Sequence, residues 1–319
     1  MTKYIITGFA GFVSRHFLNL LEEYNEKAIV LGLDINQPDF DYTHFKNIKC
    51  QLKIVDLLQQ SEVENIIYQF QPEYILHLAS YSSVAFSWKN PSASFANNTN
   101  IFLNLLEQIR KMKISCRILS VGSSEEYGNV TADKLPLHED LELFPVSPYA
   151  VARVSQEMLS KVYVQGYGMD IVMTRSFNHI GPWQKEIFVI PSFAKKLCEM
   201  KKHGSERLMR TGDLSIVRDF VDVRDVVRAY YMLLHNGKSG EIYNICSGVG
   251  TSLNDMINTM SAILGIDVTC ETEPSLVRPN DNQIIIGSNK KLVGHVGWER
   301  KISIEHSLKD IIDYWNSIV

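Results

Sequence analysis

A short strand, a glycine turn and a helix follow one another at the N-terminus, and this order constrains the fold most strongly. Residues 4–7 form an apolar, β-branched run that predicts a buried strand, and Gly8 and Gly11 come directly after it. Apolar side chains then repeat at helical spacing, beginning with Phe12 and Val13. The first glycine allows a tight turn and the second lets the backbone approach phosphates, so the pattern predicts a pyrophosphate at the helix N-terminus.

A second apolar run, over residues 28–33, ends in Asp34. This acid follows the glycine turn by about 20 residues, where a carboxylate accepts hydrogen bonds from the ribose hydroxyls of adenosine. A carboxylate at that point also repels a 2′-phosphate. Asp34 alone is also compatible with a solvated loop acid, but together with the turn it predicts a dinucleotide site that favours NAD over NADP. Ser14 replaces the third glycine of the fingerprint and is small enough for close helix–strand packing.

Further strands are predicted at residues 48–55, 72–79 and 114–121, with helical patterns between them. This alternation predicts an α/β fold with a Rossmann-type, doubly wound parallel sheet and helices on both faces. Ligands bind such sheets beyond the carboxyl ends of the strands. We therefore expect residues at two of these strand ends to contact the cofactor: Asp56 and Leu57, and Leu78 and Ala79.

Two further polar residues are candidates for this site, and the first of them has two interpretations. Asp56 could meet the adenine amino group, or it could cap a helix that starts near Ser61. Asn98 is polar among apolar neighbours near the start of a long helix predicted over residues 92–112. We expect Asn98 to brace the end of the next strand and to lie in the cofactor site.

The pattern changes at about residue 188, where short strands and helices mix with turns. A chain of 319 residues suits one large domain or two unequal lobes. We expect residues 1–177, with parts of 215–245, to form the NAD-binding domain. Residues 178–319 are expected to form most of a smaller C-terminal α/β lobe that binds the substrate.

Composition excludes several other classes of protein. The net charge of −4 and the pI near 6.2 show no basic bias, which argues against a nucleic-acid partner. No apolar run reaches membrane length. The five cysteines are scattered without a Cys-x-x-Cys pair, which predicts reduced thiols in the cytoplasm and no metal site.

Two segments carry the candidate chemistry, residues 121–128 and 147–153. Ser147 can cap a helix in which Tyr149 and Arg153, four residues apart, share one face. A fixed cation favours the phenolate of a neighbouring tyrosine, so Tyr149 could exchange a proton with a sugar hydroxyl or ketone. The hydroxyl of Ser123 would hold the same oxygen, while a nicotinamide exchanges the hydride.

Over nearly its whole length the chain resembles the extended short-chain dehydrogenase/reductases that act on nucleotide sugars. It is most similar to the branch of GDP-4-keto-6-deoxy-mannose reductases and GDP-mannose 4,6-dehydratases. The matching motifs are Thr-Gly-x-x-Gly-Phe (7–12), His-Leu-Ala (77–79), Ser-Ser-Glu-Glu-Tyr-Gly (123–128), Ser-Pro-Tyr (147–149), Arg-Ser-Phe-Asn-His-Ile-Gly-Pro (175–182), Val-Arg-Asp-Phe-Val-Asp-Val-Arg-Asp (217–225), Tyr-Asn-Ile-Cys-Ser-Gly (243–248) and Arg-Pro (278–279).

The resemblance implies a role for each matching position. Ser123 and Tyr149 would hold the reacting sugar oxygen, and Arg153 would bind the nicotinamide ribose and tune Tyr149. The family has a lysine where this chain has Arg153, whose planar fork binds differently. Substrate contacts are expected on the strand-end loop at Ser83 and, in the C-terminal lobe, at the following positions: Asn178, Val189, Arg218 and Arg278, with Asp281 in the same turn as Arg278.

The implied activity is hydride transfer at C4 of a GDP-linked manno-type sugar, in the synthesis of deoxysugar or surface-polysaccharide precursors. Reduction of a 4-keto sugar, oxidation of a 4-hydroxyl, a hexose and a heptose all remain open. One alternative is a 4,6-dehydratase in which Glu125 removes the C5 proton. A second is a catalytically weak NAD and sugar-nucleotide binder, because Arg153 replaces the lysine. The family also implies a homodimer, built as a four-helix bundle from the helix at 98–112 and the helix that carries Tyr149.

Overall fold

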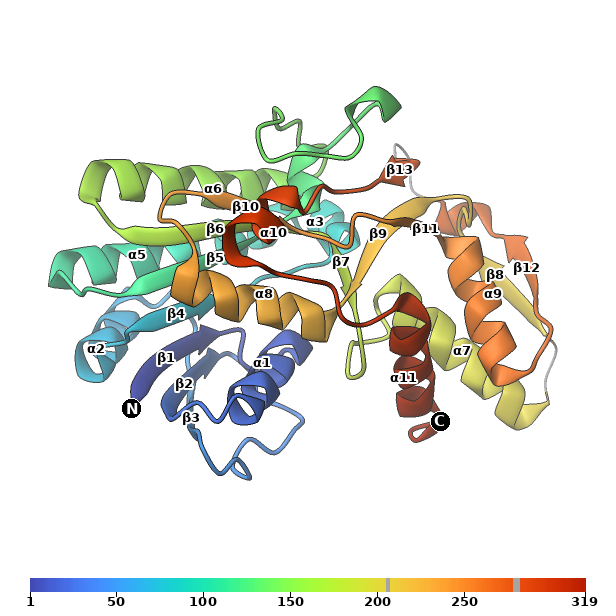
Figure 1. Cartoon of the computed structure of the whole chain (residues 1–319), viewed down its shortest axis with the longest axis horizontal. Coiled ribbons are helices and arrows are strands. Elements are labelled where there is room, and N and C mark those ends of the chain that lie inside the picture. The colour runs from blue at the N-terminus through green and yellow to red at the C-terminus, as the bar shows by residue number, and fades with distance from the viewer. Residues whose placement is uncertain (205–206, 278–281) are drawn as a thin grey trace.

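The larger part of the protein is built on a seven-stranded parallel sheet (Figure 1). The structure is a computed structural model that describes residues 1–204, 207–277 and 282–319. All six neighbouring strand pairs in this sheet are parallel. The parallel pairing and the strand order together are those of a doubly wound fold, in which the N-terminal strand lies near the middle. In spatial order the strands are β10 (Ile242–Ile245), β6 (Asp170–Ser176), β5 (Arg117–Ser123), β4 (Tyr74–His77), β1 (Thr2–Thr7), β2 (Ala28–Asp34) and β3 (Lys49–Ile54).

Helices cover both faces of this sheet, as the alternating pattern predicts (Figure 1). On one face, α1 (Phe12–Glu23) packs against α8 (Val223–Asn236), with α10 (Lys290–Val296) beside them. On the other face lie α2 (Gln60–Phe70), α5 (Ile101–Met112) and α6 (Pro148–Tyr167). Each face has its own apolar core, and the two cores share the sheet between them.

The helix predicted over 92–112 is present but divided. It consists of α4 (Pro91–Phe95), a π-helical turn η1 (Ala96–Asn100) and α5, preceded by the short α3 (Val84–Lys89). Single π-helical turns inside helices are frequent at functional sites. The described residues also contain three 3₁₀ turns: η2 (Ser124–Tyr127), η3 (Ala132–Lys134) and η4 (Pro274–Leu276).

The C-terminal lobe is built on two small sheets and three helices (Figure 1). Its four-stranded sheet places β9 (Val217–Asp222) between β11 (Gly250–Ser252) and β13 (Ile284–Ile285), and β7 (Asn178–Ile180) also pairs with β9. The second sheet pairs β8 (Leu208–Thr211) with β12 (Thr269–Thr272). A separate apolar core joins the lobe's helices, which are α7 (Val189–His203), α9 (Leu253–Leu264) and α11 (Ile304–Asn316).

Within the described residues, no helix combines the length and apolarity needed to cross a membrane. The same residues contain no group of three His, Cys, Asp or Glu side chains placed to hold a metal ion.

Candidate active site

The glycine turn after β1 is shaped for a phosphate group. Gly8 has a φ of +71°, and a Cβ at this position would lie 2.9 Å from the backbone nitrogen of Ala79. Only glycine fits so close an approach between the turn and the end of β4. Gly11 is the N-cap of α1, and no side chain caps this helix. The N-terminal N–H groups of α1 are thereby left for a ligand, and an anionic pyrophosphate suits them.

Asp34 is fixed at the end of β2 beside this turn. Its Oδ2 accepts a hydrogen bond from the backbone N–H of Ala10 at 2.9 Å, and its Oδ1 accepts one from Asn36 at 2.9 Å. Each carboxylate oxygen can accept more than one hydrogen bond, so these contacts leave capacity for ribose hydroxyls. The turn and the acid predicted to bind adenosine are therefore joined directly.

Thr7 and His77 organise the neighbouring strand ends, and the sequence analysis named them only as parts of two matching motifs, without a role. The Thr7 hydroxyl oxygen accepts hydrogen bonds from the N–H groups of Leu78 and Ala79, each at 3.1 Å, and bonds His77 Nδ1 at 2.9 Å. Burial, together with the charge of Arg153, lowers the pKa of His77 to about 3. His77 is therefore neutral, and its role is to hold Thr7. The available signal was a polar residue at the end of each of two apolar strands.

Two predicted contacts, those of Asp56 and Asn98, differ from expectation in their local geometry. Asp56 does not cap α2, because its Oδ1 accepts the N–H of Leu58 in a turn of its own at 2.9 Å, and Gln59 is the N-cap. Asn98 does not brace the next strand, β5. Its side chain is fully buried in η1 and bonds both the N–H and the carbonyl of Tyr81, after β4. A buried amide forms hydrogen bonds with the nearest backbone groups, and here these groups belong to the segment that follows β4.

Ser83, expected on a loop, is the N-cap of α3. The Ser83 hydroxyl caps this helix by accepting the N–H of Phe86 at 3.2 Å, and the Trp88 side chain is largely exposed.

The end of β5 carries Ser123 in a capping box. Its hydroxyl accepts the N–H of Glu125 at 3.2 Å, while its own N–H donates to Glu126 Oε1 at 2.7 Å. Glu126 is fully buried, and burial, with the nearby charge of Glu157, raises its pKa to about 8. Glu125 is half-buried beside it. The buried Glu126 was not singled out from sequence, and it holds the backbone from which Ser123 and Glu125 project.

Tyr149 and Arg153 meet on the buried face of α6, as their spacing predicts. Ser147 caps this helix through the N–H of Ala150 at 3.1 Å. The Arg153 Nε donates to the Tyr149 hydroxyl oxygen at 3.3 Å, and its Nη1 donates to the carbonyl of Val121 at 3.1 Å. The same helix packs against β5 and η2, so the pair lies behind the strand that delivers Ser123.

A buried ion pair links α6 to the neighbouring strand β6. Glu157 receives Arg175 Nε at 2.8 Å and Nη2 at 3.0 Å, and Lys161 bonds it at 2.9 Å. Burial alone would raise the pKa of Glu157, but the Arg175 guanidinium holds it below its usual range. Because Arg175 lies on β6, the pair fixes α6 to the sheet.

The predicted substrate contacts of the C-terminal lobe lie on three elements. Asn178 is exposed at the start of β7, and Val189 is exposed at the start of α7. Arg218 lies on β9, where its Nη1 bonds the carbonyl of Asn282 at 2.7 Å. Asn282 Nδ2 bonds the carbonyl of Gly128, which connects Arg218 to the loop after η2. The other two predicted positions, Arg278 and Asp281, lie outside the described residues.

The three aspartates of the block at 217–225 have structural roles. Asp219 accepts the N–H groups of Ser247 and Gly248 and so holds that loop. Asp222 caps α8 and pairs with Arg224, and Asp225 accepts the N–H groups of residues 301 and 302.

The turn after β7 joins the C-terminal lobe to the cofactor helix. Trp183 has a φ of +68°, which is uncommon for a residue other than glycine. Its ring lies under the guanidinium of Arg15 at 3.6 Å, and it also contacts His16 at a centroid distance of 4.8 Å. His179 stacks on Phe12, at the first position of α1. His179 and Trp183 therefore pack at the junction of the two lobes.

Comparison with known proteins agrees with this geometry. The family model described as GDP-mannose 4,6 dehydratase matches residues 5–311. The chain belongs to the GDP-mannose 4,6-dehydratase family. Among members and relatives of this family, a GDP-6-deoxy-D-mannose reductase of Pseudomonas aeruginosa is 30% identical over 99% of this chain and 98% of its own length.

Solved structures give the same placement. The RMD structure of Pseudomonas aeruginosa, solved with NADPH, has a TM-score of 0.86 at 29% identity and covers 100% of this chain and 99% of its own. A UDP-glucose 4-epimerase of Thermotoga maritima, solved with UDP-glucose, has a TM-score of 0.88 at 28% identity over 99% of each chain. This member of the GDP-mannose 4,6-dehydratase family is thus an NAD(P)-dependent, nucleotide-sugar-modifying enzyme of the extended short-chain dehydrogenase/reductase type.

Proposed function

We propose that the protein transfers a hydride at C4 of a GDP-linked manno-type sugar, with reduction of a 4-keto group as the reaction to test first. The observation that carries the proposal is the hydrogen bond from Arg153 Nε to the Tyr149 hydroxyl at 3.3 Å, on a buried helix face behind Ser123. Because the tyrosine oxygen already accepts this bond, its own hydrogen is free to pass to a substrate oxygen.

Each of the other groups has a defined part in this reaction. A bound nicotinamide supplies the hydride. The Ser123 hydroxyl holds the sugar oxygen that Tyr149 protonates, and Arg153 stabilises the phenolate that remains. Arg218 and Asn178 bind the diphosphate sugar, since charge-assisted donors suit a diphosphate. In this proposal residues 1–177, with parts of 215–245, hold the cofactor, and the remainder holds the substrate.

The test is an assay of GDP-4-keto-6-deoxy-mannose with NADH, and of the corresponding 4-hydroxyl sugar with NAD. Tyr149→Phe is expected to lower kcat by a factor of about 100 or more, the usual contribution of a general acid or base. Arg153→Lys is expected to retain activity, because the positive charge is kept. Unchanged turnover in Tyr149→Phe would remove this tyrosine from the mechanism.

A GDP-sugar 4,6-dehydratase is the second candidate, and the matching family model carries that description. Glu125 follows Ser123 by two residues in η2, and in this candidate reaction it would take the C5 proton of the same sugar. With GDP-mannose and NAD as the starting mixture, a product that has lost one molecule of water, with no net change in NADH, would favour dehydration. A catalytically weak binder is the third, and it requires that Tyr149→Phe leave a negligible activity unchanged while NADH still binds.

NAD is proposed as the preferred nicotinamide cofactor. Asp34 places a carboxylate at the end of β2, tied to the glycine turn through Ala10, and this charge disfavours a 2′-phosphate. The ratio of kcat/KM with NADH to that with NADPH is expected to exceed one and to fall by about tenfold in Asp34→Asn, since one charge is lost. A ratio below one in the unaltered protein would contradict the preference.

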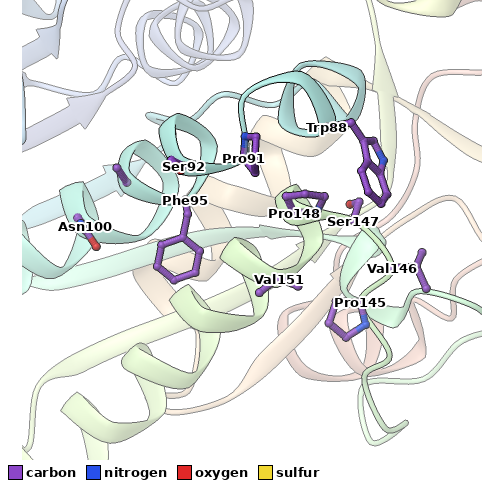
Figure 2. Close-up of a pocket in the computed structure, with 11 residues that line it drawn as sticks. Trp88, Pro91, Ser92, Phe95, Asn100, Pro145, Val146, Ser147, Pro148 and Val151 are labelled. Atoms are coloured by element: carbon purple, nitrogen blue, oxygen red, sulfur yellow. The ribbon is translucent and has the colours of Figure 1, made fainter.

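The protein is also proposed to form a homodimer through α4, α5 and α6. Val151, Met158 and Val162 form an apolar row on the outer face of α6, and Val162 is 57% exposed. An open groove of about 760 Å³ adjoins this row. Figure 2 shows Phe95 and Trp88 on either side of the start of α6 in this groove. A second copy of the same face would cover the row and the groove in a four-helix bundle.

A further inference from the structure

The buried face of α6 carries a row of polar side chains where a sheet-facing helix is ordinarily apolar. Tyr149, Arg153, Gln156 and Ser160 follow one another at helical spacing, and all four are buried against β5. Gln156 is 1% exposed. Buried polar groups are costly unless they are paired, so this row requires an explanation beyond packing.

Arg153 poses a problem of orientation that a lysine does not. A guanidinium is planar and carries several donors in a fixed fork, whereas an ammonium is a compact point charge with rotatable donors. When such a fork is buried, any donor left without a partner costs free energy. The direction of Nε, which bonds Tyr149, is also tied to the positions of the other nitrogens of the same plane.

Gln156 supplies the partner that fixes this plane. Its Oε1 accepts a hydrogen bond from Arg153 Nη1 at 2.6 Å, next to the Val121 carbonyl at 3.1 Å. With Nη1 held at these two oxygens, Nε points toward the Tyr149 hydroxyl. The contact is between groups one helical turn apart, so it depends only on α6 and the end of β5.

The amide of Gln156 is itself held in one orientation. Its Nε2 donates to the Ser120 hydroxyl at 2.8 Å and to the Val121 carbonyl at 3.2 Å. Both partners accept, so the amide nitrogen lies toward β5 and Oε1 is left to face Arg153. Ser160 bonds the Ser120 hydroxyl at 3.2 Å and completes the row without touching Arg153.

We propose that Gln156 is a positioning residue, which aims the Arg153 guanidinium so that an arginine can serve at this position. The proposal rests on the function proposed above for Tyr149 and Arg153. It predicts that the effect of Gln156 depends on which cation occupies position 153, since a lysine would not need the Oε1 acceptor to aim a planar fork.

The test is a double-mutant cycle of Gln156→Met and Arg153→Lys in the full-length protein. In the Arg153 background, Gln156→Met is expected to weaken NADH binding and lower kcat each by about tenfold, the scale of one buried contact to a charged group. In the Arg153→Lys background the same change is expected to alter both by less than about twofold. NADH binding is measured by nicotinamide fluorescence without substrate.

Two further variants separate positioning from folding. Ser160→Ala removes a hydrogen bond from the same buried row and is expected to leave NADH binding and kcat unchanged. Gln156→Glu keeps an acceptor oxygen for Nη1 and is expected to retain NADH affinity within about threefold, so it serves even if the methionine variant does not fold. Urea unfolding of every variant reports the loss of stability separately.

Equal losses from Gln156→Met in the arginine and lysine backgrounds would overturn the proposal and leave Gln156 a packing residue. A loss in Gln156→Glu as large as that in Gln156→Met would also overturn it. If the unaltered protein fails to turn over the GDP-sugar, the proposed function fails by itself, and the NADH-binding cycle still tests the role of Gln156.

Discussion

At the scale of single residues, the site depends on two buried carboxylates whose protonation differs. Glu157 is held in its charged form by Arg175, whereas Glu126 lacks such a partner, and burial favours its neutral form. Close carboxylates whose environments differ in this way titrate far apart. Glu126 bonds the N–H of Ser123, so its state bears directly on the candidate catalytic loop.

Glu126→Gln is expected to change how the free energy of unfolding depends on pH. The folded pKa of Glu126, about 8, lies above the ordinary value of 4.5, so the folded state keeps a proton that the unfolded state releases. Its contribution is fully present below the unfolded pKa and is lost as pH rises through the folded pKa. Urea unfolding between about pH 5 and about pH 8 should therefore show a steeper fall in the unaltered protein than in Glu126→Gln.

Parallel pH dependence in these two proteins would show that Glu126 titrates normally. The matched control is Glu125→Gln, which alters a half-buried carboxylate on the same turn and keeps Glu126, so the steeper fall should persist in this variant.

Sequence spacing was sufficient to predict that certain residues lie close together. Tyr149 and Arg153 are four apart and do share a buried face, and the glycine turn lies against Asp34. Gln156, Glu126 and the Thr7–His77 pair could not be selected in this way. Their roles follow from which strand lies behind each of them, and local sequence does not specify that contact.

At the scale of elements, α6 differs from an ordinary sheet-covering helix because polar side chains lie on its buried face and apolar side chains lie on its exposed face. The face against β5 carries Arg153 and Gln156, and the outer face carries Val151 and Val162. The polar face against β5 lies at the candidate site, and the exposed apolar face suits the proposed second copy of the chain. The bounds of most elements agree with the sequence pattern, but the π-helical turn η1 was missed because its residues also fit an ordinary helix.

Ser147→Ala is expected to lower the free energy of unfolding by about 1 kcal/mol, because it removes the N-cap of α6. Tyr149 lies in the first turn of this helix, so fraying should also lower kcat. Ser252→Ala is the matched control, since Ser252 caps α9 in the C-terminal lobe through Asp255. It should cost a similar free energy without the loss of kcat. An equal fall in kcat in both variants would contradict the link between this cap and Tyr149.

Val162→Glu is expected to convert the proposed dimer to a monomer. The substitution places a charge at one end of the apolar row of α6, and burying an unpaired charge at an interface is strongly unfavourable. Sedimentation velocity of both proteins at the same concentration measures the change. Tyr68→Glu is the control, because Tyr68 is exposed on α2, away from this row. A monomeric unaltered protein would rule out the proposed interface.

At the scale of the whole molecule, the two lobes meet at the N-terminal part of α1. Arg15 of α1 lies on Trp183 of the turn after β7, and His16 contacts the same ring. The division into a cofactor part and a substrate part, expected from the change of pattern at about residue 188, stays a prediction. The contacts across the junction were not predicted, because they join residues far apart in the chain.

The central claim is that Tyr149 and a nicotinamide act together at C4 of a GDP-linked sugar, and isotope transfer tests it most directly. GDP-4-keto-6-deoxy-mannose is incubated with NADH that carries deuterium on either face of the nicotinamide C4, and the product is examined by mass spectrometry and NMR. The account predicts that the deuterium from one face appears at sugar C4, and that the rate of this transfer falls by about 100-fold or more in Tyr149→Phe. A sugar product without the label from either face, or label transfer at an undiminished rate in Tyr149→Phe, would contradict it.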